Sequence, residues 1–239
     1  AGTDRVIRIE IVDNWMGLDY LDFVSVETDM VAPIADIVDV TPDPRKADAG
    51  VVTFNFDEDV TGVDISDLTL TRNGAAIDIS ELTVIQVSAN EYAIDLSTVT
   101  DMEGDYELRL NSVDSGIKDL AGNPINTDAT DRFFVDRTGP QIESVVVNDG
   151  NDQRSMVTRL TVTFTEVDKG GGSNSFLLMN TTTNIPVTTL VSTEIVNGKT
   201  VANLTFAGSG IMGGSLADGN YTLTTLATDV VDAAGNQLD

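Results

Sequence analysis

Acidic and amide residues that could bind a cation occur at two kinds of place in the chain. Asp29 and Asp136 each stand four residues before a proline, in DMVAP and DRTGP. A second set lies in two Asp-x-Ala-Gly-Asn stretches and consists of Asp119, Asn123, Asp232 and Asn236. Ca²⁺ takes about six to eight oxygen ligands, several of them carboxylates, so these residues are candidate calcium ligands. Asp and Asn next to Gly also form turns without any metal, and that second interpretation stays open.

The residue types that are missing exclude most catalytic chemistry. The chain contains neither cysteine nor histidine. It therefore has no disulfide, no thiolate nucleophile, no His-based triad and none of the usual zinc ligand sets. Paired carboxylates at Asp57–Asp59 could serve a glycosidase, but such a cluster is more often a solvated loop. Gly170–Gly172 lacks the Lys-Ser/Thr that a phosphate-binding loop requires. We predict that the protein is not an enzyme.

The net charge of the chain limits the classes of partner that it can bind. Thirteen Lys and Arg against 39 Asp and Glu give a net charge of −26. Phosphates would be repelled, which disfavours nucleic acid and anionic membranes, whereas cations would be attracted. No apolar run is long enough to cross a bilayer. Because acidic chains without cysteine are common among bacterial surface proteins, we expect an extracellular or cell-surface location.

Short alternating segments dominate the chain and predict an all-β protein. Examples are VVTFNF from Val51 and YELRL from Tyr106. Asn73-Gly74 and Asn197-Gly198 separate such segments and are typical of hairpin turns.

The segments recur as two copies of one unit. Phe56 in TFNFDE and Phe164 in TVTFTE are 108 residues apart, and the two Asp-x-Ala-Gly-Asn stretches are 113 apart. We expect an N-terminal strand or hairpin segment at 1–29, a first unit at 30–138 and a second at 139–239. About 100 residues of short strands suit a seven-stranded Greek-key sandwich.

The ordered motifs resemble those of tandem bacterial Ig-like domains, which occur in large secreted adhesins and surface proteins. The motifs are D-x-x-x-P, F-x-E, G-x-Y-x-L and D-x-A-G-N, each present twice. The resemblance implies an Ig-like sandwich, a spacer or adhesive role, and calcium at domain junctions. It also implies that Asp119 and Asp136 meet near the second unit, together with Asp149. The Ala-Gly-Asn loops are then expected at the pole opposite Asp29 and Asp136.

The closing strand of the first unit has no obvious counterpart in the second. In the first unit DLAGNPIN runs on into DATDRFFVD, whereas DAAGNQLD has no such continuation in the sequence. The N-terminal stretch AGTDRVIRIEIVD could supply it, because Thr3–Arg5 matches Thr130–Arg132. Its isoleucines alternate with Arg8 and Glu10, so one face is apolar. The predicted donor strand comprises Arg5, Val6, Ile7, Ile9 and Ile11.

Four arrangements of that strand remain open. A neighbouring subunit could donate it, which builds a head-to-tail filament because the contact does not close. The strand could fold back onto its own chain, or the chain could be one period of a longer array. It could also belong to an unrelated preceding domain, since LDYLDFVSV resembles the closing strands of jelly-roll carbohydrate-binding modules. We predict a structural subunit that assembles head to tail; the alternative is an adhesin or carbohydrate-binding spacer.

Aromatic residues follow the proposed donor strand. Trp15 is the only tryptophan, and Tyr20 lies close to it in the sequence. They could form a sugar-stacking platform for surface glycans, or they could pack a hairpin against a neighbouring sheet.

Overall fold

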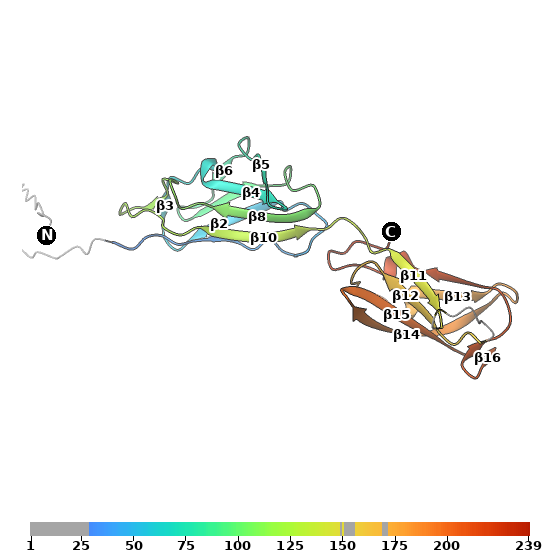
Figure 1. Cartoon of the computed structure of the whole chain (residues 1–239). Helices are drawn as coiled ribbons and strands as arrows, with labels where there is room; N and C mark the ends of the chain where they lie inside the picture. The colour runs from blue at the N-terminus through green and yellow to red at the C-terminus, as the bar shows by residue number, and fades with distance from the viewer. Residues whose placement is uncertain (1–28, 149, 151–155, 169–171) are drawn as a thin grey trace, which may run out of the picture.

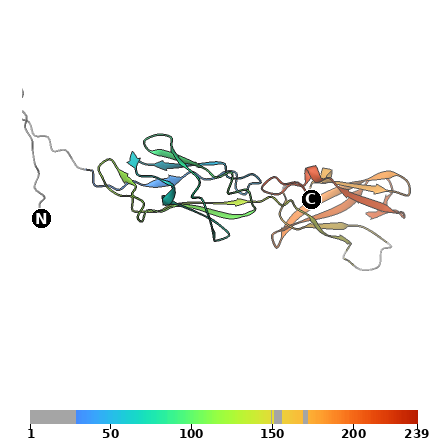
Figure 2. The same ribbon diagram turned by 90° about the horizontal axis from the view of Figure 1, so that it is seen from above.

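The computed structural model describes residues 29–148, 150, 156–168 and 172–239 of the chain. These residues form two antiparallel β-sandwiches that follow one another end to end (Figures 1 and 2). We call strands β1 to β10 unit one and strands β11 to β18 unit two. The all-β prediction is therefore confirmed. The proposed donor strand, Trp15, Tyr20 and Asp149 lie outside the described residues, and so does Gly170.

Unit one consists of two four-stranded sheets. The first has the order β1-β2-β7-β6, with bounds Ala35–Ile37, Val51–Phe56, Glu91–Asp95 and Val84–Gln86. The second has the order β10-β8-β4-β5, with bounds Ala129–Val135, Gly104–Leu110, Leu68–Arg72 and Ala75–Ile77. With β1, β2, β4, β6, β7, β8 and β10 taken as strands A to G, the orders are A-B-E-D and G-F-C. This is the Greek-key arrangement of immunoglobulin-like domains.

Alternating side chains fill the core of unit one. In β2, Val52, Phe54 and Phe56 are buried while their neighbours face outward, as the two-residue period of a strand requires. Within the second sheet, the rings of Tyr106 in β8 and of its cross-strand partner Phe133 in β10 stack with centroids 5.3 Å apart. A two-stranded ladder of β3 (Val60–Thr61) and β9 (Lys118–Asp119) and a 3-10 turn η1 (Ile65–Asp67) complete the unit.

Unit two forms one continuous six-stranded sheet with the order β11-β12-β15-β14-β13-β18. Their bounds are Ile142–Val147, Leu160–Phe164, Lys199–Ala207, Ile185–Val196, Phe176–Asn180 and Tyr221–Thr225. Strand β14 is long: residues 185–187 pair with β13 and residues 188–196 pair with β15, so it joins the two faces of the sandwich. Smaller elements are β16 (Ile211–Met212), β17 (Ser215–Leu216), η2 (Ser173–Ser175) and η3 (Ala227–Asp229).

Hydrogen bonds cross the junction between the units. The ammonium of Lys46 donates to the carbonyl of Gly235 at 3.0 Å. In the connecting segment, the Thr138 hydroxyl donates to a carboxylate oxygen of Glu103 at 2.7 Å. At the entry of unit two, the amide of Asp239 donates to the carbonyl of Pro140 at 3.0 Å. The joint is thus tied to both units. Among the described residues, no helix is long and apolar enough to span a membrane.

Candidate cation sites and an open sheet edge

A first acidic cluster lies at the entry of unit one. One carboxylate oxygen each from Asp29, Glu58 and Asp119 lies within 4.8 Å of the others. Asp29 precedes β1, Glu58 follows β2, and Asp119 ends β9. Asp119 is only 2% exposed, whereas Glu58 is half-buried and Asp29 is exposed. Three loops that are distant in sequence therefore bring three carboxylates together.

The buried carboxylate of Asp119 also folds its own loop. It accepts a hydrogen bond from the Asn123 amide at 2.8 Å and one from the Asn123 side chain at 2.6 Å. The same Asn123 side chain donates to the carbonyl of Asp29 at 3.1 Å. Burial acts to raise the pKa of Asp119, but hydrogen bonds from Asn123, Gly122 and Ala121 hold it below the ordinary value. Asn123 thus positions the entry segment beside the cluster.

A second cluster repeats this arrangement at the entry of unit two. Asp136 precedes β11, Glu166 follows β12, and Asp232 opens the second Ala-Gly-Asn loop, with carboxylate oxygens again within 4.8 Å. Asp232 is 1% exposed and accepts from the amides of Gly235 and Asn236 at 2.6 and 2.8 Å. The Asn236 side chain donates to the carbonyl of Asp136 at 2.9 Å. The contacts of Asn236 with Asp136 and Asp232 have their counterparts in the contacts of Asn123 with Asp29 and Asp119.

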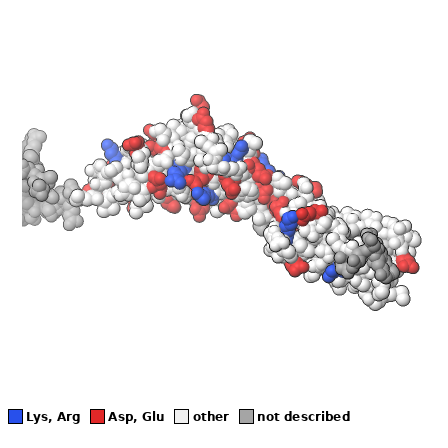
Figure 3. Space-filling view, viewed as in Figure 1, with Lys and Arg blue, Asp and Glu red and all other residues white. Residues whose placement is uncertain are grey.

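Burial and neighbouring carboxylates raise the pKa values of the two glutamates. Burial and the nearby carboxylates of Asp136 and Asp232 raise the pKa of Glu166 to about 7. Desolvation and the negative charges of Asp119 and Asp29 likewise raise the pKa of Glu58. Carboxylates held this close favour either a proton or a cation between them. Acidic side chains also form separate patches on the visible face of unit one and near the junction (Figure 3).

The expected meeting of Asp119 with Asp136 is wrong. Strands β8 and β10 are antiparallel, with Leu110 opposite Ala129, so the connection that holds Asp119 lies at the entry end of unit one. Asp136 follows the other end of β10 and belongs to unit two. The Ala-Gly-Asn loops therefore share a pole with the entry aspartate of their own unit instead of lying opposite it.

Glu58 and Glu166 are the cluster members that the sequence analysis missed. Both stand in the repeated F-x-E motif, so a signal was present. The sequence favours a solvated loop at Asp57–Asp59 and does not indicate that Glu58 is more buried than its two neighbours. The spacing alone does not say that this turn reaches the Ala-Gly-Asn loop.

The outer edge of strand β18 distinguishes unit two from unit one. Strand β18 corresponds to β8, because GNYTLTT matches GDYELRL. Each stretch begins with a glycine of positive φ, +154° at Gly219 and +150° at Gly104. In unit one, β8 lies between β4 and β10. In unit two, β18 ends the sheet, and within the described part of the chain no strand pairs with its outer edge.

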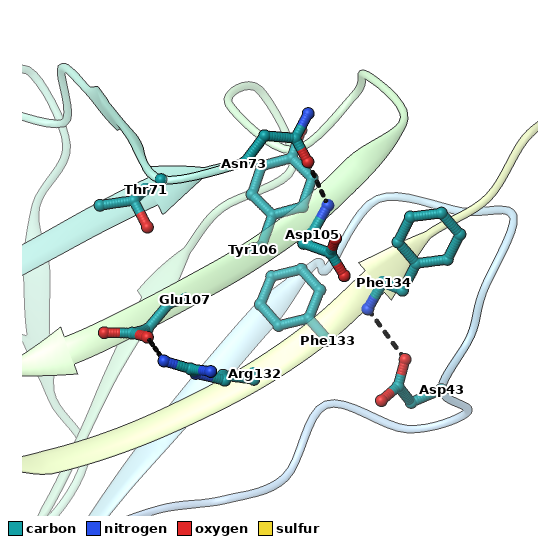
Figure 4. Close-up of a pocket in the computed structure, with 10 residues that line it drawn as sticks. Asp43, Thr71, Asn73, Asp105, Tyr106, Glu107, Arg132, Phe133 and Phe134 are labelled. Carbon is teal, nitrogen blue, oxygen red and sulfur yellow. Dashed lines mark hydrogen bonds and ion pairs between the residues drawn. The ribbon is translucent and has the colours of Figure 1, made fainter.

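The core beneath this edge is correspondingly less covered. Tyr106 and Leu108 in β8 are 1% and 0% exposed. Their counterparts in β18, Tyr221 and Leu223, are only partly buried. Figure 4 shows the covered state in unit one, where β10 runs beside β8 and places Phe133 against Tyr106. A strand equivalent to β10 would cover the same positions in unit two.

Figure 4 also shows a shallow groove of about 680 Å³ on this sheet of unit one. Its polar groups pair with one another: Asn73 accepts from the Asp105 amide at 2.9 Å, and Asp43 accepts from the Phe134 amide at 2.8 Å. Glu107 and Arg132 form an ion pair across the strands. None of the predicted site residues lines this groove.

The register of β10 corrects the proposed alignment of the donor strand. Ala129, Asp131, Phe133 and Val135 are buried, and the residues between them face outward or are half-buried. If Thr3–Arg5 takes the place of Thr130–Arg132, then Asp4, Val6 and Arg8 point inward. Ile7 and Ile9 then point outward, because side chains alternate along a strand. The three-residue match and the burial of the isoleucines therefore exclude each other.

Comparisons with known proteins find likeness only among solved structures. No family profile and no curated protein matches the chain. An I-band fragment of titin matches with a TM-score of 0.39 and 13% identity over 88% of this chain and 66% of that one. The N-terminal part of the bacterial S-layer protein SbsC matches with a TM-score of 0.30 and 19% identity, over 80% of this chain and 43% of that one. The assignment of the Ig-like fold rests on the strand order given above.

Proposed function

We propose that the chain is a non-enzymatic structural segment of a cell-surface assembly, in which Ig-like units follow one another in line. In this assembly the open edge of unit two takes a strand from the N-terminal segment of a neighbouring copy. The observation that carries the proposal is the difference between β8 and β18. The same strand is covered on both sides in unit one and on one side in unit two.

An added strand supplies what the edge of β18 lacks. It pairs with the outward backbone groups, and its inward side chains cover Tyr221 and Leu223. The contact joins two different surfaces, so it repeats from copy to copy and produces a filament or array. Residues 5–11 are the donor that the sequence predicts. Burying three isoleucines would contribute roughly 5–9 kcal/mol before ordering costs, at about 1.5–3 kcal/mol each.

The position of the N-terminal segment favours a neighbouring copy over the same chain. The first described residues enter unit one at the end that faces away from unit two (Figures 1 and 2). A head-to-tail arrangement brings this end next to unit two of the preceding copy. The charge of −26 suits a solvent-exposed surface segment.

We further propose that each acidic cluster binds Ca²⁺. Asp29, Glu58 and Asp119 would hold one ion, and Asp136, Glu166 and Asp232 would hold the other. Hard carboxylate oxygens in partly buried loops are the donors that calcium takes, so the residues fit the ion. A bound ion would neutralise the mutual repulsion and fix the entry segment of each unit to its loops. Asn123 and Asn236 then act as positioning residues, because their amide groups donate to the entry carbonyls.

Calorimetry tests the calcium sites one unit at a time. We expect Ca²⁺ to raise the melting temperature of both units over that in EGTA, by about 5 °C or more for each kcal/mol of binding energy. Asp119→Asn should abolish the rise for unit one alone, and Asp232→Asn for unit two alone. Asp59→Asn, an exposed residue next to Glu58, is the matched control. Melting temperatures that EGTA leaves unchanged would refute calcium binding.

Sedimentation velocity and negative-stain imaging test strand donation. The full chain should form head-to-tail oligomers that lengthen with concentration, whereas residues 29–239 alone should stay monomeric. Added peptide 1–28 should bind the shortened chain without linking copies. Strand donation is refuted if the full chain stays monomeric at high concentration, or if residues 29–239 assemble equally well.

A further inference from the structure

We infer that the strand donated to β18 is the segment directly before Asp29, residues 22–28, from a second copy of the chain. The inference rests on the strand donation proposed above and names the segment that performs it. Residues 22–28 read DFVSVET and lie outside the described residues.

The first argument is the order of elements at the internal junction. Strand β10 closes unit one and ends at Val135, and the next residue, Asp136, already belongs to the acidic cluster of unit two. The closing strand of one unit therefore leads into the entry of the next without any spacer. Asp29 occupies the same place in the first cluster, so the segment just before it corresponds to β10.

The second argument is the pattern of faces. Counting back from Asp29 as from Asp136, Val24 falls at the place of Asp131, and Val26 falls at the place of Phe133. Both places are buried in unit one, with 7% and 2% exposure. Ser25 falls at the outward place of Arg132. A strand with inward valines and an outward serine suits a half-buried position in a sheet.

The third argument is the register against β18. In unit one, Asp131 pairs with Leu108, Arg132 with Glu107 and Phe133 with Tyr106. Transferred to unit two, Val24 lies opposite Leu223, Ser25 opposite Thr222 and Val26 opposite Tyr221. The two partly exposed core residues of β18 thus each receive an apolar partner. Cross-strand pairs of aromatic and β-branched residues stabilise a sheet.

The resulting joint between copies repeats the joint within the chain. A strand that ends at Thr28 delivers Asp29 to the exit end of unit two, as β10 delivers Asp136. The bond from Asn123 to the Asp29 carbonyl is then the counterpart of the bond from Asn236 to Asp136. Residues 5–11 do not produce this geometry, because 17 residues separate Ile11 from Asp29.

The absence of cysteine makes a cross-linking test clean. Thr222 is exposed on β18, so Thr222→Cys in one chain provides the acceptor. It is mixed with a second chain that carries either Ser25→Cys or Arg8→Cys, and the mixture is oxidised mildly. Arg8 would lie opposite Thr222 if residues 5–11 were the donor with Ile7 and Ile9 inward, at the places of Asp131 and Phe133. We expect covalent dimers with Ser25→Cys and none above background with Arg8→Cys. A variant that lacks only residues 1–13 should still assemble.

The other outcomes separate the two claims. Dimers with Arg8→Cys alone, together with lost assembly after removal of residues 1–13, would overturn the choice of segment while strand donation stands. Cross-linking with neither variant, in a chain whose assembly survives removal of residues 1–28, would overturn both. A cross-link confined to single chains that carry both cysteines, even at high dilution, would show closure within one molecule and overturn the intermolecular contact.

Discussion

At the scale of single residues, the most consequential groups are the glutamates of the two clusters. The groups beside Glu166 in its cluster are the carboxylates of Asp136 and Asp232. The folded state of unit two therefore holds a group that resists ionisation near neutral pH. A proton relieves this repulsion, and Ca²⁺ at the proposed site would relieve it as well, so we expect the stability of the unit to depend on both.

Replacing Glu166 tests this coupling. Its pKa is about 7 in the folded chain against an ordinary value of 4.5, so the folded state binds the proton more tightly. In EGTA, unit two should therefore gain stability as the pH falls from about 7 to about 4.5 and lose it as the pH rises. Glu166→Gln should flatten this dependence, raise the melting temperature at about pH 8 and abolish the effect of Ca²⁺. Calorimetry across this range measures all three.

Glu194→Gln is the control for that experiment, because Glu194 is exposed on β14 of the same unit. It should leave the pH dependence and the calcium effect unchanged. An unaltered pH profile in Glu166→Gln would contradict the assigned environment of this carboxyl.

Gly139 makes the closest backbone approach at the junction. A Cβ placed on it would lie 1.9 Å from the carbonyl oxygen of Gln237, which cannot move without shifting the chain. We expect Gly139→Ala to destabilise unit two by about 1–3 kcal/mol, the usual cost of overpacking. Urea unfolding measures the loss, with Ser144→Ala on the exposed strand β11 as the control. Equal stability of the two variants would show that the contact is not kept in solution.

At the scale of elements, one strand explains how the units differ. Leu108 in β8 and Leu223 in β18 occupy equivalent places, but among the described residues a closing strand covers only Leu108. A matched pair of truncations reports this difference. Leu108→Ala should cost unit one about 2–5 kcal/mol, while Leu223→Ala should cost unit two clearly less in dilute chain.

Urea unfolding in the presence of peptide 1–28 extends the comparison. The bound strand should bring the cost of Leu223→Ala closer to that of Leu108→Ala. A large cost for Leu223→Ala in the dilute chain without peptide would mean that β18 is already covered.

The sequence predicted much at this scale, and its errors have physical causes. Repeated motifs were enough to predict the two sandwiches, because strand period and turn residues are local; the strand that pairs with the outer edge of β18 stays a prediction. The alignment of Thr3–Arg5 failed because identity over three residues does not fix which face points inward. The pairing of Asp119 with Asp136 failed because the pole of a loop depends on the direction of β8 and β10, which spacing does not contain. Glu58 was missed for the same reason.

At the scale of the whole molecule, the two described units follow one another end to end, and the same kind of acidic cluster lies at the entry of each. At the entry of each unit, an asparagine side chain ties the Ala-Gly-Asn loop to the entry aspartate. The large negative charge should keep separate chains apart, and divalent cations at the two acidic clusters would reduce this repulsion. Divalent cations should therefore strengthen head-to-tail assembly through an added strand.

Hydrogen exchange of β18 tests the central claim most directly. Alternate amides in residues 221–225 face the outer edge, so their protection reports whether a strand is bound there. We predict that these amides exchange fast in dilute chain and become protected as the chain concentration rises, whereas β8 stays protected throughout. If β18 is as protected as β8 in dilute monomer, or remains unprotected in concentrated chain, unit two does not receive a strand from another copy.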